Sequence, residues 1–111
     1  MAHDPEMEQK IAAAGVGGPE VRCRRMFGGL CYLAGGNMAF GIYQDNLIVR
    51  LGDAGEAARL VSAGQALPLA ITGRVMQGWV MVPKGRLLSL ADYRGWLEKG
   101  LACARSLPAK G

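Results

Sequence analysis

The run of residues 26–44, which contains no charged side chain, restricts the possible folds more than any other feature of this sequence. It is long enough for a membrane-spanning helix, which takes about 20 apolar residues. Its centre, however, reads Gly35-Gly36-Asn37, a combination typical of a turn. Two short strands, Leu30–Leu33 and Met38–Tyr43, therefore explain the run better than one helix, and we expect no membrane partner.

A second turn signal, Asp45-Asn46, follows directly and predicts a tight hairpin. The segment after it, Leu47–Leu51, alternates apolar and other residues, which is typical of a strand with one buried face. The residues that this alternation places on one face are Met38, Phe40 and Ile42 before the turn and Leu47, Val49 and Leu51 after it. The two segments therefore predict a pair of antiparallel strands.

Capping signals predict three helices. Asp4 followed by Pro5 indicates the start of the first, Asp53 with Glu56 the start of the second, and Ser89 the start of the third. We expect the last helix to end near Ser106, before Pro108. Gly95 and Gly100 lie inside it at a cost of about 1 kcal/mol each relative to Ala. For Gly100 our interpretation is a close approach of the helix to the sheet.

Three further segments read as extended, which completes the expected fold. These are Val21–Phe27, Leu67–Ile71 and Val75–Val82. We predict an α+β fold with an antiparallel sheet of about five strands, a meander plus a hairpin. Helices at the N-terminus, in the middle and at the C-terminus should pack mainly on one face. The 111 residues fit a single domain over 1–111, with a core of about 4–108.

Charge and cysteine content give weaker limits. The formal charge of +4 favours contact with nucleic acid or acidic proteins without specifying either. The three cysteines, Cys23, Cys31 and Cys103, are odd in number and form no CxxC pair. Together with an N-terminus that lacks the apolar block of a signal peptide, they predict reduced thiols and a cytoplasmic location.

The sequence contains no recognisable catalytic or metal-binding constellation. Its only histidine is His3, so an internal Ser-His or Cys-His pair is not available. Cys23 lies between Arg22 and Arg24, whose charges can lower the pKa of a thiol, but an ordinary strand cysteine is the favoured interpretation. We therefore expect no enzymatic activity, no metal and no cofactor.

The arginines remain the most informative polar residues. Alternation places Arg22 and Arg24 on one strand face and Arg25 on the other, where burial would require a partner for its charge. Trp79 can stack on a ligand, although a core position is the commoner outcome in an apolar strand. The candidate binding or structural residues are Arg22, Arg24, Arg25, Met26, Phe27, Gly28, Gly29, Arg74 and Trp79.

Four runs of sequence carry a family resemblance. They are Arg24–Leu30, Gly36–Leu47 followed by Arg50, Thr72–Val80 and Ala104–Pro108. In this order and spacing they resemble the N-terminal domain of the TfoX/Sxy family. The resemblance covers most of the chain from about Glu20 onward. The resemblance implies a compact α+β domain. Full-length relatives regulate natural competence with the cyclic-AMP receptor protein and carry a second domain. We expect this chain, which ends at Gly111, to lack that domain.

The expected function is that of a non-catalytic regulatory or interaction module, linked through the resemblance to transcriptional regulation or competence. Its partner would be another protein or a second copy of the chain, because small domains gain buried area by association. Two alternatives stay open. One is direct nucleic-acid binding through Arg22, Arg24 and Arg25, and the other is a small-molecule binder or enzyme using Gly28-Gly29 and Trp79.

Overall fold

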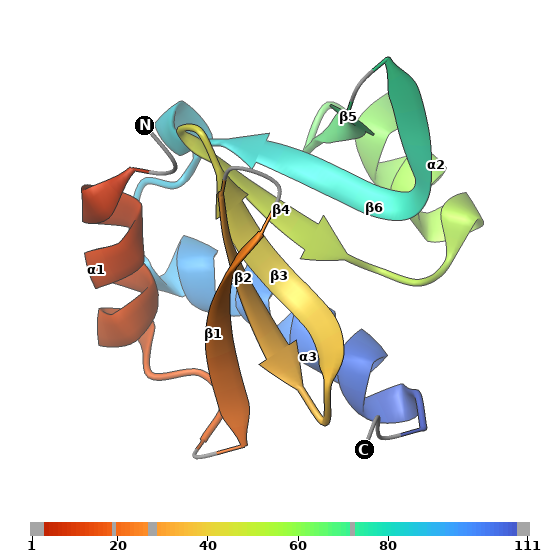
Figure 1. Ribbon diagram of the computed structural model, residues 1–111. Helices are drawn as coiled ribbons and strands as arrows, with labels where there is room; N and C mark the ends of the chain where they lie inside the picture. Colours follow the sequence, from red (N-terminus) through yellow and green to blue (C-terminus); the bar gives the residue numbers. More distant parts are fainter. Residues whose placement is uncertain (1–3, 19, 27–28, 72, 109–111) are drawn as a thin grey trace.

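An antiparallel sheet forms the framework of the protein (Figure 1). The computed structural model describes residues 4–18, 20–26, 29–71 and 73–108. In these residues the sheet has six strands, one more than the approximate count from the sequence, in the order β1-β2-β3-β4-β6-β5. The strands are β1 (Val21–Met26), β2 (Gly29–Ala34), β3 (Asn37–Tyr43), β4 (Asn46–Arg50), β5 (Leu67–Ile71) and β6 (Arg74–Pro83). The first four form a meander and the last two a hairpin, so the predicted α+β fold is confirmed.

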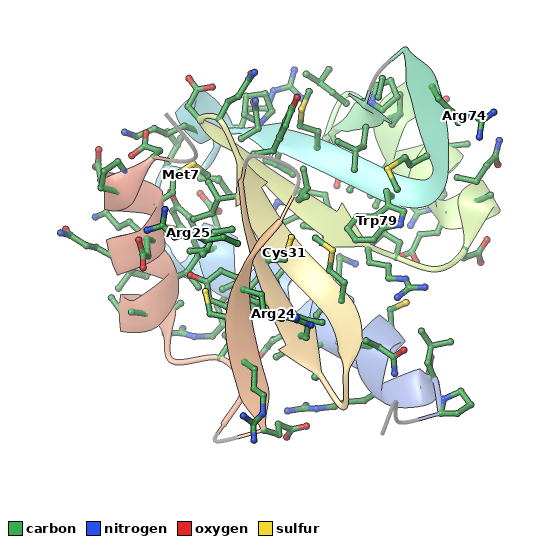
Figure 2. The ribbon with its side chains drawn as sticks, viewed as in Figure 1. Met7, Arg24, Arg25, Cys31, Arg74 and Trp79 are labelled. Carbon is green, nitrogen blue, oxygen red and sulfur yellow. The ribbon has the colours of Figure 1, made fainter. Side chains whose placement is uncertain are left out.

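Three helices lie with their apolar sides on one common core. They are α1 (Pro5–Ala14), α2 (Ala54–Ser62) and α3 (Leu90–Ser106), and a short 3-10 turn, η1 (Lys84–Arg86), precedes α3. Helix α3 packs on the middle strands, α2 packs on β5 and β6, and α1 packs on α3. Met7 of α1 is fully buried and points inward in Figure 2. None of the described helices is of the length and apolarity that crossing a membrane requires.

The core side of the sheet follows from the strand register. Phe40, Val49 and Val80 lie opposite one another across β3, β4 and β6, and Ile42, Leu47 and Val82 form the next row. All six are buried in the same cluster as the helix residues. The predicted apolar faces of the two hairpin strands are therefore confirmed, with the exception of Met38.

Met38 lies on the opposite face, because β3 contains a bulge. Tyr32 is opposite Phe40, whereas its neighbour Leu33 is opposite Met38, so Ala39 is an extra residue in β3. Adjacent residues of β2 face opposite sides, and their partners Phe40 and Met38 must do the same. The prediction that Met38 shares a face with Phe40 is therefore wrong, because strict alternation does not allow for an inserted residue.

The hairpin turn between β3 and β4 is displaced by one residue from its predicted place. Tyr43 pairs with Asn46, so the loop consists of Gln44 and Asp45 rather than Asp45 and Asn46. Gln44 adopts the left-handed backbone region with φ 59°. Asn46 instead begins β4, and its side-chain amide donates a hydrogen bond to the carbonyl of Tyr43 at 3.3 Å.

Gly100 confirms the close approach expected of the last helix. A Cβ atom on this residue would overlap with the carbonyl oxygen of Ala39 in β3. Gly95, one and a half turns earlier, has open space at the corresponding position. The two glycines of α3 therefore differ in role: only Gly100 lets the helix backbone rest on the sheet.

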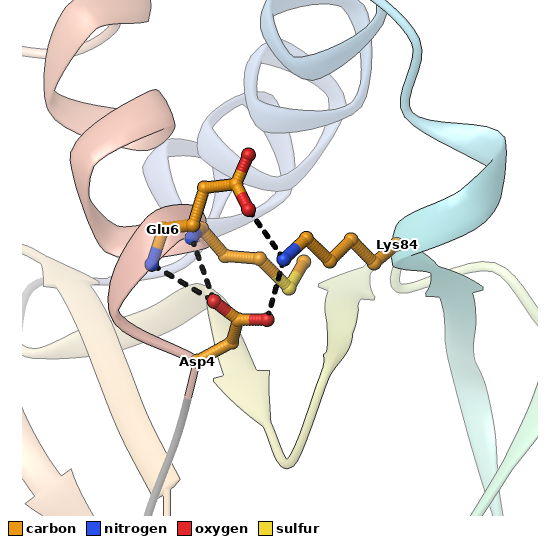
Figure 3. Close-up of polar contacts among 4 residues, drawn as sticks. Asp4, Glu6 and Lys84 are labelled. Carbon is orange, nitrogen blue, oxygen red and sulfur yellow. Dashed lines mark hydrogen bonds and ion pairs between the residues drawn. The ribbon is translucent and has the colours of Figure 1, made fainter.

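The predicted helix starts are also confirmed, and the first carries a charge cluster (Figure 3). The Asp4 carboxylate accepts hydrogen bonds from the backbone N–H groups of Glu6 and Met7. Its other oxygen accepts one from the Lys84 ammonium at 2.9 Å, and Lys84 also pairs with Glu6 at 2.6 Å. The cluster thus joins the start of α1 to the end of the hairpin β5–β6.

This cluster makes the stability of the fold dependent on pH. The Lys84 ammonium holds the pKa of Asp4 below its ordinary value of 3.8, so the pair stabilises the fold above that pH. The contribution is lost as the pH falls through 3.8 toward the folded-state value. We expect Lys84→Met to lower the free energy of unfolding at about pH 7 but to have little effect near pH 2. Urea denaturation of both proteins at several pH values measures this, and a pH-independent difference would contradict the assignment.

Candidate functional site

The side of the sheet that faces away from the helices forms a continuous surface, here called the open face. Figure 2 shows Arg24, Cys31 and Trp79 on this side, with α3 running behind the strands. Strand register defines two rows of residues on it. The first row is Arg24, Cys31, Gly41, Ile48, Met81 and Leu67, and the second comprises Arg22, Leu33, Met38, Arg50 and Trp79. Residues from six strands thus meet on one surface.

The centre of the open face is apolar and closely packed. Cys31 and Ile48 are only 2% and 4% exposed, although none of the described helices covers this side. Larger neighbours shield them: Leu33, Met38 and Met81 are partly buried around them. The Met38 methyl group lies over Gly41, where an added Cβ would be 3.2 Å from it. The result is a closely packed apolar strip along β2, β3 and β4.

Arginines flank this strip on two sides. Arg22 and Arg24 are exposed on the edge strand β1. Arg50 of β4 donates a hydrogen bond to the carbonyl of Met38 at 3.4 Å, and its guanidinium lies 5.8 Å from the centre of the Trp79 ring. The two rows of the open face contain no Asp or Glu among the residues described. The described part of the chain also gives Arg22 and Arg24 no ion-pair partner.

Arg25 lies on the other face of β1, as predicted. It is opposite Leu30, a core residue, and Figure 2 shows it on the side of α1. Its side chain is nevertheless exposed, because β1 is an edge strand. The cost of burying an unpaired charge therefore does not arise at this position.

The remaining candidate residues are dispersed. Arg74 is exposed at the far end of the hairpin β5–β6, well away from Arg24 (Figure 2). Met26 ends β1 opposite Gly29, whose missing side chain leaves room for the carbonyl of Ile42. Phe27 and Gly28 lie outside the described residues. The sequence-derived set is therefore divided: of its described members, Arg22, Arg24 and Trp79 belong to the two rows of the open face, whereas Arg25 and Arg74 lie elsewhere.

Trp79 does not occupy the core position expected of it. It is partly exposed on the open face beneath Arg50. It also borders a pocket of about 310 Å³ between α2 and the hairpin β5–β6, which Val61, Val75 and Met76 help to line. Among the described residues, the lining of this pocket includes Trp79 but not Gly29.

The thiol of Cys23 is not activated by its arginine neighbours. Cys23 is exposed, yet desolvation of its thiol by the surrounding protein and the nearby Glu8 carboxylate raise its pKa above the ordinary 9.0. Arg25 opposes this shift but does not reverse it. Burial raises the pKa of the Cys31 thiol as well. Within the described residues, no three His, Cys, Asp or Glu side chains gather closely enough to hold a metal ion.

These pKa shifts predict slow thiol chemistry. At about pH 8 the thiolate fractions of Cys23 and Cys31 should lie below that of a free cysteine, because burial disfavours the charged form. We expect iodoacetamide to modify Cys23 more slowly than it modifies a cysteine in an unstructured peptide. Mass spectrometry of timed samples gives the rates, and labelling of Cys23 faster than the peptide would contradict the expectation.

Arg50 and Ile48 lie on the open face, although neither belongs to the candidate binding residues predicted from the sequence. The signal was present in the alternation of Leu47, Val49 and Leu51, because Ile48 and Arg50 must then face the opposite side. What alternation does not provide is the register that places them beside Met81 and Trp79.

Comparison with known proteins places the chain in a family. The model of the TfoX N-terminal domain matches residues 8–104, which include all three helices except the ends of the first and last, and every strand of the sheet. Searches of curated proteins and of solved structures returned no match. Since the matched residues make up most of the sequence and carry the whole sheet, this chain belongs to the TfoX N-terminal domain family.

Proposed function

We propose that this domain is a non-catalytic interaction module that binds a partner protein across its open face. The observation that carries the proposal is an apolar strip on a side of the sheet that none of the described helices covers. Its partly exposed members are Leu33, Met38 and Met81, and Cys31 and Ile48 lie buried beneath them. Contiguous apolar surface of this kind commonly marks a site of protein association. A role in transcriptional regulation or competence, which the family resemblance implies, would use this face to reach its partner.

The chemistry of the described side chains supports a role without catalysis. The Cys23 and Cys31 thiols have raised pKa values, which disfavour the nucleophilic thiolate. The carboxylates of Asp4 and Asp53 are occupied in capping helices, and that of Glu20 pairs with Arg105. The positions of these three carboxylates are therefore accounted for by structural roles.

A quantitative capture experiment tests the proposal. Wild-type protein, the double variant Leu33→Gln/Met81→Gln and the control Leu88→Gln are immobilised in equal amounts and exposed to lysate of the source cell. Leu88 is 84% exposed but lies just before α3 and its N-cap Ser89, so its variant removes apolar surface elsewhere. We expect proteins retained by the wild type and the control to be lost from the double variant. Equal retention on all three would contradict the proposal.

Nucleic-acid binding is the second candidate, and the exposure of three arginines on one edge strand favours it. Arg22, Arg24 and Arg25 all reach solvent from β1. Binding of this kind would weaken steeply with salt, because phosphate contacts release counterions. Fluorescence anisotropy with labelled duplex DNA, single-stranded DNA and RNA at low and near-physiological salt measures it. The triple variant to Gln should abolish such binding, and no binding at low salt would exclude this candidate.

A further inference from the structure

The spacing of the arginines on the open face matches the width of a helix. Arg22 and Arg24 stand on β1 and Arg50 on β4, and two strands separate them. Three strand spacings correspond to roughly 14 Å. An α-helix with its side chains is about 10–12 Å across. A helix lying along the strands would therefore cover Cys31, Leu33 and Met38 and have a guanidinium on each side.

The charges on this face specify the chemistry of such a helix. The strip needs apolar side chains on the facing side of the helix, and the flanking arginines need carboxylates beside it. Because the two rows of the open face hold no described Asp or Glu, the face itself supplies no counter-charge. An acidic partner provides it, and a basic partner would be repelled.

The same observations disfavour the two other occupants. A second copy that docks face to face would place Arg22, Arg24 and Arg50 against an identical surface. Because that surface also lacks carboxylates, it would give these charges no partner. A nucleic-acid strand stacks its bases on aromatic rings, but the ring of Trp79 already has Arg50 over it. The aliphatic strip between the arginines gives bases no further stacking partner.

We propose, resting on the function above, that the open face binds an acidic amphipathic helix of another protein. The apolar side of that helix packs on Leu33 and Met38, and its carboxylates pair with Arg22 and Arg24 on one side and Arg50 on the other. Arg25, although adjacent in sequence and exposed, faces away and takes no part. This difference between two neighbouring arginines is the distinctive consequence of the proposal.

A display selection tests it. The wild-type domain is used to select from a library of peptides of about 15 residues, roughly four helical turns, in which the apolar helical stripe is fixed and all other positions vary. We expect acidic sequences to be enriched. Synthesised peptides should bind Arg24→Gln about tenfold more weakly than the wild type and Arg25→Gln equally well. Sedimentation of the wild type and anisotropy with DNA and RNA are run alongside.

Each outcome bears on a definite claim. Enriched peptides that are neutral or basic, or that lose affinity equally in Arg24→Gln and Arg25→Gln, overturn the acidic helix. If their binding still disappears in Leu33→Gln/Met81→Gln, the proposed function stands without it. The acidic helix is also overturned if the wild type forms a dimer that is lost in the double variant. It is overturned likewise if the domain binds nucleic acid and Arg25→Gln abolishes that binding. No enrichment at all overturns the acidic helix, and the capture experiment above then decides the proposed function separately.

Discussion

Replacing Gly100 by Ala should destabilise the protein, although Ala is the better helix former. The substitution gains about 1 kcal/mol in helix propensity. The new Cβ, however, would overlap with the backbone carbonyl of Ala39, and backbone cannot turn aside as a flexible side chain can. Overpacking of this kind costs roughly 1–3 kcal/mol and occasionally more. Because the overlap is with backbone, we place the cost near the upper end of this range and expect a net loss of about 2 kcal/mol and a fall in Tm of roughly 8 °C.

Gly95 provides a matched control in the same helix. It is exposed, and nothing lies within 4 Å of an added Cβ. Gly95→Ala should therefore raise the free energy of unfolding by about 1 kcal/mol. Urea denaturation of the two variants and the wild type measures both changes. If Gly100→Ala were as stabilising as Gly95→Ala, the close seating of α3 on β3 would be wrong.

Local sequence signals predicted the elements well, because those elements depend on short-range chemistry. Asp4, Asp53 and Ser89 cap helices through their own side chains and the next few backbone N–H groups. Alternation in Leu47–Leu51 identified a strand with a buried face because side chains in a strand alternate by geometry. Both signals are complete within a few residues of sequence.

Features that depend on pairing between strands were less accessible. The bulge at Ala39 moved Met38 to the open face, and no local signal in that run marks an inserted residue. The expected core position of Trp79 was wrong for a similar reason, because the face on which Trp79 lies depends on its pairing with Arg50. A residue's alternation fixes which neighbours share its face, but only register decides which face meets the helices.

The candidate site illustrates the same division. That Arg22 and Arg24 share a face, with Arg25 opposite, followed from alternation within one strand. The apolar strip beside them did not, because Cys31, Met38 and Ile48 come from three different strands. None of these residues belongs to a motif on its own. They form a continuous apolar surface only when the sheet brings them together.

Phe40→Ala should produce the largest loss of stability. The ring is 1% exposed, stacks on Tyr32 with centroids 4.9 Å apart, and lies where α3 crosses β3. Truncation leaves a cavity beneath a helix held close at Gly100, so little collapse can refill it. We expect a loss of about 3–5 kcal/mol, a large part of the 5–15 kcal/mol typical of a whole domain.

Phe40→Leu keeps this prediction measurable if the alanine variant does not fold. Leucine retains much of the buried volume but forfeits the stacking on Tyr32, which is worth roughly 0.5–1.5 kcal/mol. Its loss should therefore be about 1–2 kcal/mol, well below that of Phe40→Ala. Urea denaturation followed by circular dichroism gives both values. Equal and small losses in the two variants would mean that this part of the core can collapse, and that the seating of α3 on β3 is looser than Gly100 indicates.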